Sequence, residues 1–171
     1  MTDKINKILS DLIGLSLTRT TRAANMECLK FGTVYRTDKD GKTNNIGEFA
    51  LHLTCPWRVT NETQIIVGSA DLYQQADETS EYDENYDYHE FNANLRDVKL
   101  DKLINENKLS VVSVNADKFG GLEICFDSNI KLTVFPDLTS KADNEYWRLI
   151  DFRNEKSKHL ESWTTGYDTS D

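Results

Sequence analysis

The sequence predicts a single α+β domain built from two antiparallel β-meanders and two helices. Residues 49–57 alternate apolar and polar side chains, and a similar run returns over 64–73, which indicates a β-hairpin with one buried face. Apolar residues spaced three and four apart predict helices over residues 3–13 and 97–107. Three further strand patterns follow the second helix at short intervals, as is typical of a meander.

The first helix, residues 3–13, has one apolar stripe that suits a helix covering the core. The stripe consists of Ile5, Ile8, Leu9, Leu12 and Ile13. Thr2 or Asp3 can cap the start of this helix, and Gly14 suits its end. An exposed stripe that binds a partner is the alternative interpretation.

Two strands are expected between this helix and the hairpin, over residues 15–23 and 26–36. The sequence Asp-Lys-Asp-Gly at 38–41 indicates a turn, and a loop is expected to continue to residue 45. Because these connections are short, the strands and the hairpin are expected to form the first antiparallel meander.

The central hairpin, residues 47–73, contains the most unusual side chains of the chain. If Val59 and Gln64 close the polar turn, the residues that face each other are all apolar or small. The predicted pairs are Trp57 with Ile66, Cys55 with Gly68, Leu53 with Ala70 and Leu51 with Leu72. The same register places His52 opposite Asp71 on the other face.

Pro56 is the weak point of this register, because proline donates no ladder hydrogen bond and a bulge there would separate His52 from Asp71. Beside Asp71, His52 would have the setting of a catalytic base, while a polar strand residue is the plainer interpretation. Arg58 follows Trp57 and could stack on an aromatic ring, pair with an acid or clamp an anionic ligand. His52 and Asp71 are therefore catalytic candidates, and Arg58 is a binding candidate.

Residues 74–90 change character and predict a long surface loop, because like charges repel and no apolar period is present. The segment has no Lys or Arg, and its acidic residues are Asp77, Glu78, Glu81, Asp83, Glu84, Asp87 and Glu90. Loops of this length within a compact domain are often functional or disordered. These seven residues are the main candidates for a binding surface.

Part of this loop matches the opening D-x-N-x-D pattern of a calcium loop through Asp83, Asn85 and Asp87. The rest of the pattern fails, because Tyr88 stands at the position of the sharp-turn Gly and Asn94 at that of the bidentate Glu. A regular EF-hand is excluded, and loose Ca²⁺ or Mg²⁺ binding is an alternative. We predict neither a metal site nor a cofactor.

The second helix, residues 97–107, has Asp97 as its expected cap. The strands expected after it cover residues 109–114, 122–126, 130–134 and 145–152. The last of these has a helical turn as its alternative. We expect one domain over residues 1–155 and a polar, partly ordered tail over 156–171.

Net charge, cysteine content and the distribution of apolar residues limit the classes of function that this protein can have. Twenty-nine acidic against twenty basic residues give a net charge of −9. This balance disfavours nucleic-acid binding, which needs clustered Lys and Arg, and it favours basic protein partners, with solubility as the plainer explanation. Cys28, Cys55 and Cys125 are far apart and odd in number, so neither a zinc site nor a disulfide framework is expected. No apolar stretch suits a membrane span or an export signal, and we expect a cytoplasmic protein.

Several short stretches together resemble a group of uncharacterised bacterial cytosolic proteins of similar length. They include the sequences LHLTCPWR at 51–58, SADLY at 69–73, FPD at 135–137 and YWRL at 146–149. The resemblance spans most of the chain and implies a single domain. It implies no activity, cofactor or catalytic residue.

The function we expect from the sequence is that of a non-catalytic cytosolic binding protein. Its acidic loop would engage a basic protein partner, and an immunity-like role would fit that pattern. The alternative is a small-ligand module or an enzyme with a polar site at His52, Arg58 and Asp71. The sequence favours neither a particular partner nor an oligomeric state.

Overall fold

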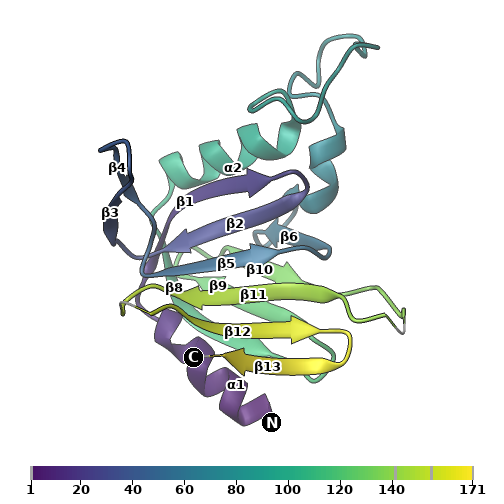
Figure 1. Ribbon diagram of the computed structural model, residues 1–171. Helices are drawn as coiled ribbons and strands as arrows, with labels where there is room; N and C mark the ends of the chain where they lie inside the picture. The colour runs from purple at the N-terminus through teal and green to yellow at the C-terminus, as the bar shows by residue number, and fades with distance from the viewer. Residues whose placement is uncertain (1, 141, 155, 171) are drawn as a thin grey trace.

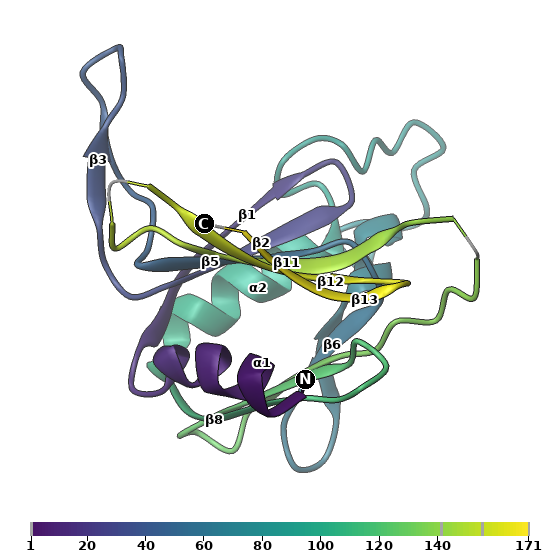
Figure 2. The same cartoon turned by 60° about the horizontal axis from the view of Figure 1, so that its bottom comes forward.

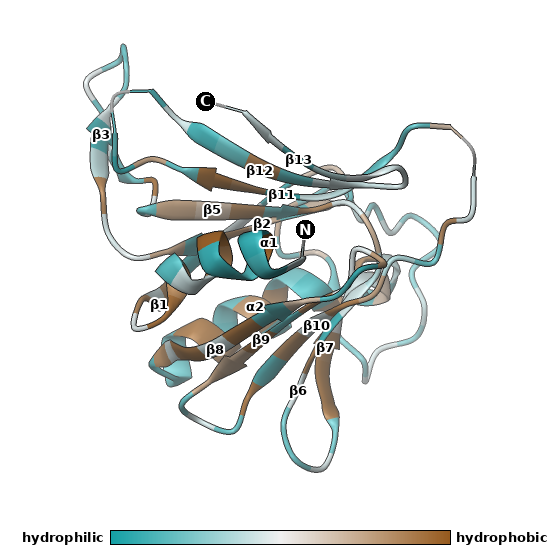
Figure 3. Ribbon diagram, turned by 90° about the horizontal axis from the view of Figure 1, so that it is seen from below, coloured by the Kyte–Doolittle hydropathy of each residue, from teal (hydrophilic) through white to brown (hydrophobic). Residues whose placement is uncertain are grey.

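One long antiparallel sheet bends over on itself, so that two half-sheets face each other across the core (Figure 3). The computed structural model describes residues 2–140, 142–154 and 156–170. The first half-sheet contains β1 (Ser16–Ala23), β2 (Met26–Phe31), β5 (Phe49–Leu53), β11 (Glu145–Asp151), β12 (Lys158–Trp163) and β13 (Gly166–Ser170). The second half-sheet contains β6 (Trp57–Thr60), β7 (Ile65–Gly68), β8 (Leu109–Ala116), β9 (Leu122–Phe126) and β10 (Lys131–Val134).

The strand order is β13-β12-β11-β5-β2-β1-β8-β9-β10-β6-β7. The half-sheets meet at β1 and β8, where Ser16 and Leu17 pair with Ser110 and Leu109. A separate two-stranded ribbon of β3 (Tyr35–Thr37) and β4 (Thr43–Asn45) extends from the sheet (Figure 1).

The helices lie at two sides of the space between the half-sheets (Figure 2). Helix α1 (Thr2–Leu9) continues into a 3₁₀ turn, Ser10–Leu12, and Gly14 follows with a φ of +88°. Helix α2 (Leu95–Glu106) packs against β1, β7 and a second 3₁₀ turn, Ser69–Tyr73. Helix α1 packs against β8, so each helix buries its apolar face against strands of the sheet.

The core fills the space between the half-sheets. Its largest side chains are Trp57 from the second half-sheet and Trp147 from the first, and both are almost fully buried. The indole N–H of Trp147 donates a 2.7 Å hydrogen bond to the carbonyl of Gly120, so burial leaves this polar group satisfied. Alternating apolar residues on each strand supply the rest of the core.

The antiparallel pairing of the strands and the two helices are confirmed. The loop predicted to continue to residue 45 is wrong at its end, where β4 pairs with β3, and the strand predicted to reach residue 73 ends at Gly68, because residues 69–73 form a 3₁₀ turn. The predicted strand sequence β8–β9–β10 forms a meander, as do β1, β2 and β5. The two meanders are parts of a single eleven-stranded sheet, so the domain is mainly β with little helix. Pairing between distant segments, such as β10 with β6, joins them in a way that sequence periodicity does not specify.

The predicted central hairpin is wrong in its pairing. Strand β5 does not pair with residues 66–72: it lies between β2 and β11, with Leu51 opposite Leu29 and Leu149. The chain crosses to the second half-sheet at Pro56, and β6 then pairs with β7 in a register that puts Val59 opposite Val67. The predicted inward positions of the apolar side chains are nevertheless confirmed, since Leu51, Leu53 and Trp57 are buried.

The reason for this error is that β5 is a central strand, with β2 on one side and β11 on the other. An alternating apolar pattern shows which side chains face inward but does not select among several strands with equivalent patterns. Pro56, which cannot donate to a ladder, marks the crossover between half-sheets.

The segment expected as a polar tail adds two strands to the sheet. Strand β12 pairs with β11, and β13 pairs with β12, so the fold continues past the expected boundary at residue 155, which itself lies outside the described residues. Leu160 and Ser162 are buried. Only one of these two is a large apolar residue, which explains the weak strand signal. For residues 145–152, the predicted strand is confirmed as β11, and the helical alternative is wrong.

The three cysteines, Cys28, Cys55 and Cys125, are free thiols. Among the described residues, neither helix has the length and apolar character needed to cross a membrane.

Candidate functional site

The seven acidic residues between 77 and 90 lie on a long excursion between the 3₁₀ turn Ser69–Tyr73 and α2, which we call the acidic loop (Figure 1). All seven are exposed, as predicted for a surface loop. Glu78 lies 3.8 Å from the ammonium group of Lys99. Within the described parts of the chain, the other six have no ion-pair partner.

The acidic loop is shaped by its own hydrogen bonds. The carboxylates of Asp77, Asp83 and Asp87 each accept a hydrogen bond from the backbone N–H two residues later, at 2.8–2.9 Å. The Gln75 side chain joins two parts of the loop, because it donates to the carbonyl of Glu81 and accepts from the N–H of Asp83, both at 3.0 Å. Three carboxylates are therefore held in turns, which Asp favours for this reason.

Arg22, from β1, anchors the end of the acidic loop. Its Nε lies 2.9 Å from a carboxylate oxygen of Asp97 on α2, and the two side chains are 8% and 4% exposed. Its Nη2 donates to the carbonyls of Tyr88, His89 and Glu90 at 2.9–3.0 Å. One buried guanidinium thus joins β1, α2 and the loop, which uses the fork geometry specific to arginine.

A second buried ion pair, Glu27 with Arg96, lies beside the first. Arg96 Nε is 3.2 Å from Glu27 Oε2, and both side chains are at most 2% exposed. Burial raises the pKa of Glu27 to about 7, although the positive charge of Arg96 acts in the opposite direction. Arg96 also donates to the carbonyl of Asn25 at 3.1 Å and lies over the Trp57 ring.

The start of α2 contributes to the same cluster. The predicted cap, Asp97, is wrong: the cap is Asn94, whose Oδ1 accepts a 2.9 Å hydrogen bond from the N–H of Asp97. Asn94 Nδ2 donates in turn to the Asp97 carboxylate at 2.8 Å. Because Asn94 caps the helix, the Asp97 carboxylate is available to accept hydrogen bonds from Arg22 Nε.

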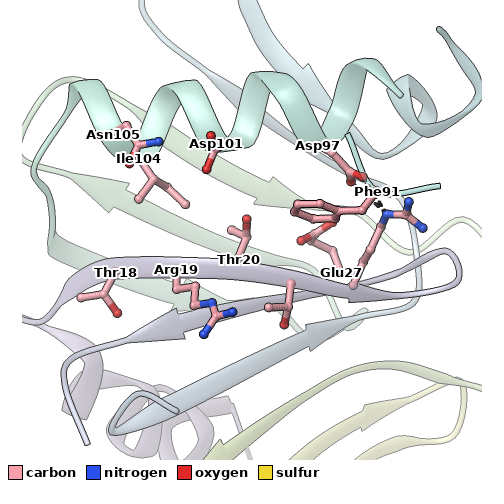
Figure 4. A pocket seen from close by; sticks show the side chains of 11 residues that line it. Thr18, Arg19, Thr20, Glu27, Phe91, Asp97, Asp101, Ile104 and Asn105 are labelled. Atoms are coloured by element: carbon pink, nitrogen blue, oxygen red, sulfur yellow. Dashed lines mark hydrogen bonds and ion pairs between the residues drawn. The ribbon is translucent and has the colours of Figure 1, made fainter. Parts of the chain in front are cut away.

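A groove of about 370 Å³ runs between β1 and α2 (Figure 4). Its β1 wall consists of the consecutive residues 18–22, and its α2 wall includes Asp101 and Ile104, with Phe91 at the end next to the acidic loop. In the described chain, β8 covers this edge of β1 only at Ser16 and Leu17. The backbone N–H and C=O groups of a helix bond to each other, so α2 cannot pair with the rest of this edge of β1 as a strand would.

The predicted site at His52, Arg58 and Asp71 is not assembled as expected. His52 lies on β5 opposite Cys28 and Arg148, so its predicted pairing with Asp71 is wrong. The Asp71 carboxylate accepts a 2.8 Å hydrogen bond from the N–H of Gly68, where it shapes the 3₁₀ turn.

The other two predicted residues also have local contacts. The Arg58 guanidinium lies 5.5 Å from the centre of the Phe135 ring rather than on Trp57. His52 is half-buried, and burial together with the nearby Arg148 lowers its pKa. Among the described residues no hydrogen bond or ion pair joins His52, Arg58 and Asp71 to one another.

Sequence reasoning missed the buried charges that organise the loop. Arg22 and Glu27 face each other across the tight turn between β1 and β2. Their opposite charges, one position outside the pair Ala23 and Met26 that closes the turn, were a usable signal that the two side chains lie near each other. Nothing in the spacing indicates Asp97 or Arg96, which lie about seventy residues further along the chain.

Comparisons with family models, curated proteins and solved structures found no match for this chain. Within the described ranges, no group of three or more His, Cys, Asp or Glu side chains is arranged to hold a metal ion. The D-x-N-x-D carboxylates of Asp83 and Asp87 accept backbone hydrogen bonds within the loop.

Proposed function

We propose that this chain is a non-catalytic binding protein whose acidic loop engages a basic surface of a protein partner. The observation that carries the proposal is the anchoring of the loop by Arg22. A loop that is already shaped loses less conformational entropy on binding than a free one. Six exposed carboxylates without a basic partner among the described residues leave the charge available to a partner.

Exposed aromatic side chains at the loop add apolar contact to its charge. Tyr82 and Phe91 are 71% and 72% exposed, and Tyr73 is 54% exposed. Aromatic residues are common among the side chains that dominate binding energy, while surrounding charges steer encounter and set specificity. This combination supports a protein partner with a basic surface, and neutralisation of a toxin by an immunity-like protein is one instance of such binding.

The test uses three glutamates of the loop, Glu81, Glu84 and Glu90, whose side chains make no ion pair or hydrogen bond within the described chain. Tagged wild-type protein and the triple Gln variant are used to capture proteins from the native cells. Partners are identified by mass spectrometry, and their affinities are then measured with purified proteins. We expect at least one basic partner whose Kd rises about tenfold or more in the variant, equivalent to about 1.4 kcal/mol.

The matched control removes the same charge elsewhere, as Asp3→Asn, Asp40→Asn and Glu106→Gln, at exposed positions. Binding should be retained by the control and should weaken with added salt in the wild type. Equal loss in both variants would show that only net charge matters, and that result would reject the acidic loop as the binding surface. Failure to capture any partner that depends on the loop would reject it as well.

A further inference from the structure

A second cleft lies on the side of the molecule that α1 covers, and its charge is opposite to that of the acidic loop. We call it the α1 cleft; it has a volume of about 700 Å³. Figure 2 shows α1 between the two half-sheets. The walls of the cleft come from α1 and from the inner face of β5, β11, β12 and β13.

Two faces of α1 have different surroundings. Ile5 and Leu9 are buried in the core, and the Asn6 side chain accepts a 2.7 Å hydrogen bond from the N–H of Ala116 at the end of β8. The adjacent face, with Lys4, Lys7 and Ile8, lines the cleft together with Asp11 of the following 3₁₀ turn. The helix is thus attached to the second half-sheet and leaves space against the first.

The inner face of the first half-sheet changes from apolar to charged along its strands. The register puts Leu149 next to Leu160, and Leu160 next to Thr169, in one cross-strand row. Two residues further along, Asp151 pairs with Lys158. Because strand side chains alternate between faces, this charged pair lies on the same inward face as the buried leucines. Charged residues at such positions indicate a solvated or ligand-filled space rather than a packed core.

The charges that line the α1 cleft are mostly positive. Lys4, Lys7, Arg153 and Lys158 face Asp11 and Asp151, although acids outnumber bases in the chain as a whole. Both acids are engaged by Arg153, whose Nη2 lies 2.7 Å from a carboxylate oxygen of each. In the described chain, Lys4 and Lys7 have no ion-pair partner. The positive charge of these two lysines is therefore not neutralised within the protein.

We propose that the α1 cleft binds a small anionic amphiphile. Its carboxylate or phosphate head would lie between Lys4 and Lys7. Its apolar body would lie against Ile8, which is half-buried, above the apolar floor that Leu149 and Leu160 form. The volume falls within the range of about 300–1,000 Å³ that is usual for small-molecule sites, and such sites combine an apolar lining with a few polar groups. This site is independent of the acidic loop and of its partner.

Isothermal titration of the full chain tests the proposal, below the micellar concentration of each probe. The probes are dodecanoate, dodecyl phosphate, dodecylamine and acetate. We expect saturable one-to-one binding of at least one of the two anionic amphiphiles, with both the amine and acetate at least about tenfold weaker. The ratio of dodecanoate to dodecyl phosphate affinity identifies the preferred head group.

The variant Lys4→Gln/Lys7→Gln should weaken that binding about tenfold or more. The matched control, Lys39→Gln/Lys42→Gln, removes the same charge at the turn of the β3–β4 ribbon and should bind like the wild type. All four lysines are exposed, so both variants should fold. The proposal is overturned by absence of saturable binding, by equal binding of dodecylamine, by acetate binding as tightly as the amphiphiles, or by equal affinities of the two lysine variants.

Discussion

Two arginines tie the helices to the first half-sheet, and they do so in different surroundings. Arg22 joins α2 and the acidic loop to β1, with only 8% of its side chain exposed. Arg153 joins the 3₁₀ turn after α1 to β11 through Asp11 and Asp151, and its side chain is 39% exposed. Both use the same planar fork to reach carboxylates, and Arg153 also lies over the Phe49 ring at 4.5 Å.

This difference shows that the contact geometry of an ion pair does not by itself determine how much the pair stabilises the protein. An exposed ion pair competes with water and salt, and it contributes about 0–1 kcal/mol. Breaking a buried pair leaves an uncompensated charge without water, which costs about 3–5 kcal/mol. Loss of Arg22, the anchor of the acidic loop, should therefore destabilise the protein strongly. The ion pairs of Arg153, which line the α1 cleft, should be weak and sensitive to salt.

The largest effect is expected for Arg22→Met. This change leaves the Asp97 carboxylate buried without its partner and removes the donor shared by three loop carbonyls. We expect the free energy of unfolding, measured by urea denaturation, to fall by about 3–5 kcal/mol. The amides of residues 88–90 should also exchange faster with deuterium, because local anchoring is lost.

Arg19→Met is the matched control, since Arg19 lies on the same strand and is exposed. Its effect should be within about 0.5 kcal/mol of the wild type, as is usual for surface substitutions. If the two variants were equally stable, burial of Arg22 would not be what gives the tie its strength.

Much of the secondary structure could be predicted from the sequence, but the sheet order could not. The turns before 122 and 130 define β9 and β10 well. The periodicity of residues 3–13 predicts α1 but not its end, because the α-helix stops at Leu9, a 3₁₀ turn follows and Ile13 is exposed. The partners of β5 depend on which of several apolar strands packs against it, and β11 follows nearly a hundred residues later. The local apolar pattern contains no information about that choice. A prediction that pairs β5 with the nearest apolar run, residues 66–72, is therefore wrong.

The second effect is a dependence of stability on pH that Glu27 produces. Its folded-state pKa of about 7 exceeds its ordinary value of 4.5, so between these values the folded protein holds a proton that the unfolded chain releases. The stabilisation from Glu27 is therefore fully present below about pH 4.5 and is lost as the pH rises through 7. The loss is up to about 1.4 kcal/mol per pH unit, and about 3 kcal/mol over the whole range.

Glu27→Gln should remove this slope, because the amide does not titrate. Urea denaturation at pH 5, 6, 7 and 8 gives the difference in unfolding free energy between wild type and variant. This difference should change most between pH 5 and 7 and should level off towards pH 8. Glu84→Gln, at an exposed position of the acidic loop, should give a difference that is nearly constant. A constant difference for Glu27→Gln would show that the buried pair keeps both its charges throughout this range.

The acidic composition of the candidate site could be predicted from the sequence, but the contacts that hold the loop in shape could not. Residues 74–90 have enough acids and no bases to place them on the surface, which the exposure of all seven acids confirms. Whether such a loop is shaped depends on Arg22, which lies 66 to 68 residues before the carbonyls it contacts. The hypothesis of a site at His52 and Asp71 failed for the same reason as the hairpin on which it depended.

The smallest effect is expected for Arg153→Met, which keeps an apolar stem over Phe49 and removes both ion pairs. We expect a loss of at most about 1 kcal/mol at low ionic strength. The loss should shrink in about 1 M NaCl, where the screening length is about 3 Å, while the loss in Arg22→Met should persist because salt does not reach its buried pair. Paired urea denaturations at both salt concentrations measure this contrast. If Arg153→Met cost as much as Arg22→Met, or if salt reduced both losses equally, exposure would not determine the strength of these ion pairs. The attachment at the α1 cleft would then be as strong as the anchoring of the acidic loop.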